Sequence, residues 1–134
     1  MISMIVNIWW ITLCVFYEAR SESLEAQIGV AHAVMNRSAN RSISVENVVK
    51  QAAQFSWYKP GMTYHVLGTE PPEVVSQCLE AVYKCMSARL NGDIFSGADH
   101  FYSVDIPEPK WAKSMDMVGQ IGPFRFYKAR KKGR

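Results

Sequence analysis

The chain has 134 residues, of which 49% are hydrophobic and 20% charged, with 8 glycines, 6 prolines and 3 cysteines. This composition excludes collagen-like, disordered and disulfide-scaffold proteins, and a chain of this size buries roughly two thirds of its unfolded surface. The net charge is +3, but the five Lys and Arg residues within residues 128–134 leave residues 1–127 with −2. We therefore expect one domain over residues 1–127 and a basic tail over residues 128–134, suited to contact with an anionic envelope.

The first predicted helix, Ile5–Ala19, is apolar almost all round, as is typical of a helix at the centre of a core. The apolar run Ile2–Phe16 is shorter than the ~18 residues of a spanning helix. It has no Lys or Arg before Arg20 and no small-residue cleavage site. We expect a buried helix, no stable membrane span, and synthesis in the cytoplasm without a signal peptide. Trp9 and Trp10 leave an interfacial membrane role open.

Capping residues and apolar spacing predict three further helices. Ser23 can cap the second, which we expect to end near Asn36–Arg37, and Ser44 can cap a short third helix. Pro71–Pro72 opens the fourth helix, which ends at Asn91–Asp93. The apolar face predicted for the fourth helix consists of Val75, Cys78, Leu79, Val82 and Met86.

The last third of the chain has the pattern of short extended segments and loops. Residues 101–104 and 121–127 are the extended segments, the second with alternating aromatic side chains. The sequence therefore predicts a mainly α fold with minor β structure, an α+β single domain.

Neither a metal nor a cofactor site is predicted. His32, His65 and His100 lie far apart in the sequence, no zinc motif is present, and the glycines occur singly rather than in a phosphate-binding loop. Cys78 and Cys85 lie ~10.5 Å apart along the fourth helix, beyond the reach of a disulfide. We expect all three cysteines to be reduced and buried.

Glu18 is the candidate catalytic group. It closes an apolar helix directly after Phe16 and Tyr17, and a carboxyl held against apolar and aromatic walls has a raised pKa. Cleavage of a glycosidic bond needs such a proton donor at neutral pH. The alternative is an ion pair with Arg20 or Arg37 that only joins two helices, and the carboxylate taken alone favours this alternative.

Many tyrosines and tryptophans fall in predicted loops or short strands rather than on helical core faces. Such rings can form platforms for sugars in a groove, although they also fill irregular cores. They are Trp57, Tyr58, Tyr64, Tyr102, Trp111 and Tyr127.

Several segments together form a recognisable set. Tyr17–Glu22 reads YEARSE and is followed by Gln27–Arg37, QIGVAHAVMNR, a combination that is specific at this spacing. Further downstream are Phe55–Trp57, Ala98–Tyr102, Pro109–Ala112, Gly119–Gly122 and Phe126–Tyr127. This set resembles the SleB-like cell wall hydrolase family, which comprises spore-cortex-lytic enzymes and phage endolysins. The resemblance covers nearly all of the chain except the N-terminal residues and the tail.

The resemblance implies a lysozyme-like fold that cuts the β-1,4 bond between N-acetylmuramic acid and N-acetylglucosamine in the glycan strands of bacterial peptidoglycan. It assigns Glu18 as general acid, and in a lytic transglycosylase the resulting carboxylate takes a proton from the 6-hydroxyl of muramic acid, which closes a 1,6-anhydro ring. Hydrolysis by water is the alternative, for which inverting enzymes use a second carboxylate roughly 6.5–9.5 Å away. On this basis we expect a monomeric phage endolysin without cofactor, which is made in the host bacterial cytoplasm and acts on the wall.

The substrate-binding candidates on this basis are Glu22, Ser56, Trp57, Tyr102 and Trp111. The supporting candidates are Tyr17, Arg20, Gln27, Asn36, Arg37 and His100. Two other classes stay open: a non-enzymatic binder of nucleic acid or another anionic polymer through the tail, and a small membrane-associated protein using Ile2–Phe16. The net −2 of residues 1–127 argues against specific nucleic-acid binding.

Overall fold

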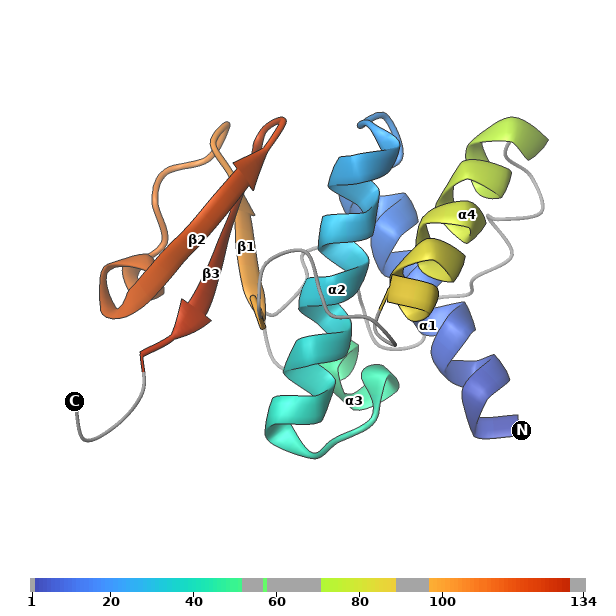
Figure 1. The fold of residues 1–134 in the computed structure, drawn as a ribbon, viewed down its shortest axis with the longest axis horizontal. Coiled ribbons are helices and arrows are strands. Elements are labelled where there is room, and N and C mark those ends of the chain that lie inside the picture. The colour runs from blue at the N-terminus through green and yellow to red at the C-terminus, as the bar shows by residue number, and fades with distance from the viewer. Residues whose placement is uncertain (1, 52–56, 58–70, 89–96, 131–134) are drawn as a thin grey trace.

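The computed structural model describes residues 2–51, 57, 71–88 and 97–130. Within these residues, four α-helices come first, and a 3₁₀ helix and three strands follow (Figure 1). The helices are α1 (Ile2–Ala19), α2 (Leu24–Arg41), α3 (Val45–Lys50) and α4 (Pro72–Ala88), and the 3₁₀ helix is η2 (Lys110–Ser114). The strands are β1 (His100–Ser103), β2 (Met115–Ile121) and β3 (Phe124–Ala129).

Helix α1 supplies much of the core through its second half, which is buried from Trp10 to Phe16. Its first turns are exposed, with Met4 and Ile5 more than half accessible. The helix begins three residues earlier than predicted and ends at Ala19, as predicted. No helix among the described residues has the length and apolar character needed to cross a membrane.

Helix α2 begins as predicted, since the Ser23 side chain accepts a hydrogen bond from the Ala26 N–H at 3.1 Å. It does not end near Asn36–Arg37, as expected, but continues to Arg41, and Ser42 follows in the left-handed region at a φ of 54°. The predicted end was wrong because Asn36 and Arg37 are polar yet buried. They interrupt the apolar pattern without interrupting the helix.

Helices α3 and α4 pack against the first two helices. The Ser44 cap of α3 is confirmed, and α4 begins at Pro72. The face predicted for α4 was wrong at Leu79, which is 46% exposed. Smaller side chains allow a close approach between helices, and the buried residues of α4 are Cys78, Ala81, Val82 and Cys85. The predicted end at Asn91–Asp93 lies outside the described residues.

The three strands form an antiparallel sheet in the order β1-β3-β2. Strand β2 and the helix η2 were not predicted. The alternation of β2 is broken by a bulge between Met117 and Gly119, which removes the period-two signal. Gly122, at a φ of 55°, joins β2 to β3, a conformation that suits glycine.

The sheet packs on one side of α2, whereas α1 and α4 lie on its other side (Figure 1). The ring of Phe126 presses on Gly29 so closely that a Cβ at this position would lie 2.7 Å from the Phe126 Cζ. Phe101 and Phe124 complete the aromatic cluster around Phe126. The ring centroid of Phe101 lies 5.7 Å from that of Phe124 and 6.0 Å from that of Phe126. Gly29 therefore permits the sheet to reach the helical core.

All three cysteine side chains lie in the hydrophobic core. Cys14, Cys78 and Cys85 are buried thiols outside any disulfide, as predicted, and burial raises the pKa of Cys78 to about 11. Strand β3 runs two residues beyond the predicted domain limit at residue 127. Arg130 donates to the Asp116 carboxylate at 3.0 Å, so the tail starts against the sheet.

Candidate active site

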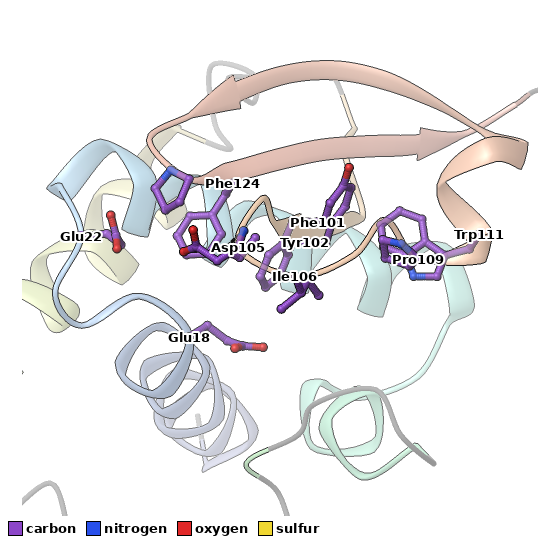
Figure 2. A pocket seen from close by; sticks show the side chains of 11 residues that line it. Glu18, Glu22, Phe101, Tyr102, Asp105, Ile106, Pro109, Trp111 and Phe124 are labelled. Carbon is purple, nitrogen blue, oxygen red and sulfur yellow. Dashed lines mark hydrogen bonds between the residues drawn. The ribbon is translucent and has the colours of Figure 1, made fainter.

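A cleft of about 440 Å³ separates the end of α1 from the sheet (Figure 2). Its helical side carries Glu18 and Glu22, and its other side is formed by β1, the loop after it, η2 and the turn between β2 and β3. The residues on that second side are Phe101, Tyr102, Ser103, Asp105, Ile106, Pro109, Trp111, Pro123 and Phe124.

Glu18 lies in the last turn of α1 and points into the cleft (Figure 2). Burial raises the pKa of this carboxyl from 4.5 to about 7, and the positive charge of Arg37 opposes part of the rise. The negative end of the helix dipole also disfavours an ionised carboxylate here. Glu18 therefore holds a proton near neutral pH and can donate it to a group bound in the cleft.

The break between α1 and α2 is fixed by Gln27, a supporting candidate that is fully buried. Its Nε2 donates to the carbonyl oxygens of Ala19 and Arg20, at 3.0 and 3.5 Å. The Glu22 N–H also donates to the Ala19 oxygen, at 3.0 Å. These bonds satisfy carbonyls that the end of a helix leaves open, and they hold the turn that carries Glu18.

Asn36 and Arg37 attach α2 to the start of β1. The Asn36 Nδ2 donates to the Ala98 oxygen and the Arg37 Nε donates to the Asp99 oxygen, both at 2.8 Å. Burial, with the charge of Arg41, lowers the pKa of Arg37 to about 10, so Arg37 remains a cation at neutral pH. The pair links the two sides of the cleft, and Arg37 also restrains the proton affinity of Glu18.

His100 belongs to a polar group behind the cleft wall rather than to its lining. Its Nδ1 lies 3.0 Å from an Asp99 carboxylate oxygen, and the Asn40 Nδ2 donates to the other oxygen at 2.9 Å. Burial raises the pKa of Asp99, but the hydrogen bonds from His100 and Asn40 outweigh it, so the pKa is below its usual value. The imidazole packs on Trp111, with centroids 5.0 Å apart. His100 thus supports Trp111.

Tyr102 and Trp111, two of the predicted substrate-binding candidates, lie together in the lining of the cleft. Their rings meet edge to face at 5.9 Å, and both contact the ring of Tyr127. The Tyr102 hydroxyl accepts a hydrogen bond from the Arg125 guanidinium at 3.2 Å. The result is a rigid aromatic wall that can receive the apolar face of a sugar ring.

The remaining candidates occupy different places. Glu22 lines the cleft beside the Gly122 turn. Tyr17 and Trp57 stack on each other, with centroids 4.8 Å apart, and neither lines the cleft. Arg20 is exposed, with its guanidinium 5.2 Å from the centre of the Phe16 ring. Ser56 lies outside the described residues.

Sequence reasoning missed several residues of the sheet side, among them Ser103, Asp105 and Ile106. A carboxylate in a turn directly after a predicted strand was the available signal for Asp105. Within the described part of the chain, no group of three or more His, Cys, Asp or Glu side chains could hold a metal ion.

Comparison with known proteins identifies the family of the chain. A family model described as Cell Wall Hydrolase matches residues 21–127, and the chain belongs to this family. It is therefore an enzyme of cell wall peptidoglycan degradation, and the predicted family is confirmed. The match begins three residues after Glu18. No curated protein matches the chain.

Two solved structures share the fold. The catalytic domain of the SleB protein of Bacillus cereus has a TM-score of 0.67 at 22% identity, over 91% of this chain and 89% of that one. The catalytic domain of the germination-specific lytic transglycosylase SleB of Bacillus anthracis has the same TM-score and identity, over 91% and 93%. The prediction of a mainly α fold with minor β is thereby confirmed.

Proposed function

We propose that this enzyme cuts the β-1,4 bond between N-acetylmuramic acid and N-acetylglucosamine as a lytic transglycosylase, with Glu18 as its general acid and base. The observation that carries the proposal is one partly buried carboxyl, with a pKa raised to about 7, at the wall of a cleft. A general acid works best when its pKa lies near the operating pH.

The proposed reaction uses the carboxyl group of Glu18 twice, first as an acid and then as a base. The Glu18 carboxyl gives its proton to the glycosidic oxygen as the bond to C1 of muramic acid breaks. The carboxylate then takes the proton of the C6 hydroxyl while that oxygen bonds to C1. A 1,6-anhydro end forms, a new 4-hydroxyl end leaves, and Glu18 is protonated again.

The rest of the cleft suits a glycan strand. Tyr102 and Trp111 offer rings for stacking on sugars, and Glu22 offers a hydrogen-bond acceptor near one end of the cleft. The shared fold with the SleB catalytic domain of Bacillus anthracis, described as a lytic transglycosylase, supports the same class of reaction. The role as a phage endolysin and the contact of the tail with an anionic envelope stay predictions.

The variant Glu18→Gln tests this proposal on purified peptidoglycan. Loss of the proton donor should lower the rate on the order of 10²–10⁴-fold, measured by release of soluble muropeptides. The matched control is Glu25→Gln, because Glu25 is an exposed glutamate of α2 outside the cleft. Circular dichroism checks the fold of both. A folded Glu18→Gln variant with the wild-type rate would refute the proposal.

A further inference from the structure

The loop after β1 forms a tight turn that holds Asp105 at the cleft. The Val104 N–H donates to the Pro123 oxygen at 2.8 Å, and the Ile106 N–H donates to the Ser103 oxygen at 3.1 Å. The Ser103 hydroxyl accepts from the Asp105 N–H and donates to the Asp105 carboxylate, both at 3.2 Å. The carboxylate is therefore oriented by bonds to its own turn, and the turn is fixed to the β2–β3 hairpin.

Asp105 and Glu18 lie on different sides of the cleft. Figure 2 shows Glu18 rising from the end of α1, Asp105 on the sheet side, and Glu22 toward one end. Glu22 follows Glu18 by four residues and is tied to the same helix end through the Ala19 oxygen. An inverting glycosidase needs its acid and its base on opposite faces of the sugar ring. Asp105 meets this requirement better than Glu22.

The two carboxyl groups also differ in solvation. Glu18 is partly buried at the helix end, whereas Asp105 is exposed and accepts a hydroxyl hydrogen bond. Two carboxyl groups with such different environments suit the separate roles of acid and base. The cleft between them, at about 440 Å³, has room for a sugar ring and a water molecule.

On the basis of the proposed function, we infer that Asp105 is a second catalytic carboxylate, which directs a water molecule to C1 and gives the enzyme a hydrolytic outcome beside the anhydro one. In this step the water oxygen bonds to C1 as the glycosidic bond breaks. One water proton passes to the Asp105 carboxylate, and the Glu18 proton passes to the leaving oxygen. Exchange of protons with solvent then restores both carboxyl groups. The enzyme releases reducing and 1,6-anhydro ends from one cleft.

The test compares the two kinds of chain end in digests of purified peptidoglycan. Borohydride converts reducing ends to alditols and leaves anhydro ends unchanged, so mass spectrometry counts both. Wild type should yield both kinds. Asp105→Asn should lower the formation of reducing ends about a hundredfold and keep anhydro formation close to that of wild type.

Three further variants make the result specific. Asp116→Asn is the matched control, because Asp116 is an exposed aspartate of β2 outside the cleft, and it should leave both products unchanged. Glu22→Gln should keep the ratio of the two products. Ser103→Ala retains the carboxylate but removes its orienting hydroxyl, so it should lower reducing ends less than Asp105→Asn does.

Several outcomes would overturn the inference while the proposed function stands. They are a wild-type digest that contains only anhydro ends, an unchanged ratio in Asp105→Asn, and a loss of reducing ends in Glu22→Gln equal to that in Asp105→Asn. If Asp105→Asn fails a circular dichroism check, an unchanged ratio in folded Ser103→Ala overturns it as well. Failure of the proposed function has a different signature, namely both products at wild-type rate from Glu18→Gln.

Discussion

The two sides of the cleft differ in how deeply their residues are buried. On the helical side, Glu18 ends a helix whose preceding turns are buried, and a fully buried glutamine holds the helix end. On the sheet side, the residues from Val104 to Glu108 are exposed and held mainly by short-range turn bonds. Burial makes a proton donor by penalising its charge, whereas exposure keeps a carboxylate hydrated. One small domain can therefore combine a buried carboxyl that holds its proton with a facing wall that is open to water.

The largest expected effect concerns the helical side and is a pH dependence of activity. Because the pKa of Glu18 is about 7, its protonated form declines tenfold for each pH unit well above 7. We expect kcat/KM at pH 9 to be about a hundredfold below its value at pH 6, for an acid that must be protonated. Initial rates on soluble glycan fragments between pH 5 and 9 measure this. A flat profile up to pH 9 would contradict a buried acid.

The next largest effect is on the free energy of unfolding, which the substitution Glu18→Gln should raise although it lowers activity. The folded-state pKa of Glu18 lies above the ordinary value of 4.5, so the glutamate stabilises the fold fully below about pH 4.5 and loses this contribution as the pH rises through 7. Above pH 7 the fold must hold a buried charge. At pH 8 the free energy of unfolding of Glu18→Gln should therefore exceed that of wild type by up to about 3 kcal/mol.

Denaturant titration of both proteins at pH 8 and pH 4 checks this prediction. The difference between Glu18→Gln and wild type should shrink at pH 4, where both side chains are neutral. Glu25→Gln should show no gain at pH 8, because Glu25 is exposed. Equal free energies of unfolding for wild type and Glu18→Gln at pH 8 would show that burial does not destabilise the ionised form of this carboxylate.

A third prediction concerns the contact between helix α2 and the sheet. In Gly29→Ala the new Cβ would meet the buried Phe126 ring at 2.7 Å. The better helix propensity of alanine offsets up to about 1 kcal/mol, and overpacking should still leave a net loss of about 1–2 kcal/mol. Thermal denaturation measures the loss. Adding Phe126→Leu should cost less in the Gly29→Ala background than alone, and simple additivity would argue against the clash.

The smallest effect tests a position remote from both sides. Ser42 ends α2 at a φ of 54°, where a side chain is disfavoured and glycine is not. Ser42→Gly should raise the free energy of unfolding by about 0.5 kcal/mol, and its activity should equal that of wild type. A lower free energy of unfolding in Ser42→Gly would show that the Ser42 hydroxyl stabilises the fold by more than the left-handed backbone conformation destabilises it.

The sequence was most informative where the determining interactions are local. The apolar run before Glu18 predicted its burial, and Ser23 and Ser44 marked helix starts through bonds to residues three positions on. The end of α2 was missed because Asn36 and Arg37 bond to carbonyls 62 positions away. Those partners cannot be read from the helix itself.

The sheet side was harder to predict for the same reason. Asp105 reaches the cleft because Val104 bonds to Pro123 in the hairpin between β2 and β3, and β2 itself lacked a periodic signal. Tyr102 was found as a ring outside helical faces, but Trp57 shared that property and stacks on Tyr17 instead. Residue type alone does not separate a cleft wall from a core filler.

The bonds from Asn36 and Arg37 have a consequence for how this fold can change. Both side chains bond to main-chain oxygens of residues 98 and 99, and every amino acid supplies such an oxygen. These two bonds therefore depend on the path of the chain, whereas the bond from Asn40 of the same helix also requires the carboxylate of Asp99. A β segment from another protein that follows the same path and begins with an aspartate at position 99 would keep all three bonds, so the sheet side of the cleft could be exchanged while the helix end that carries Glu18 stays in place.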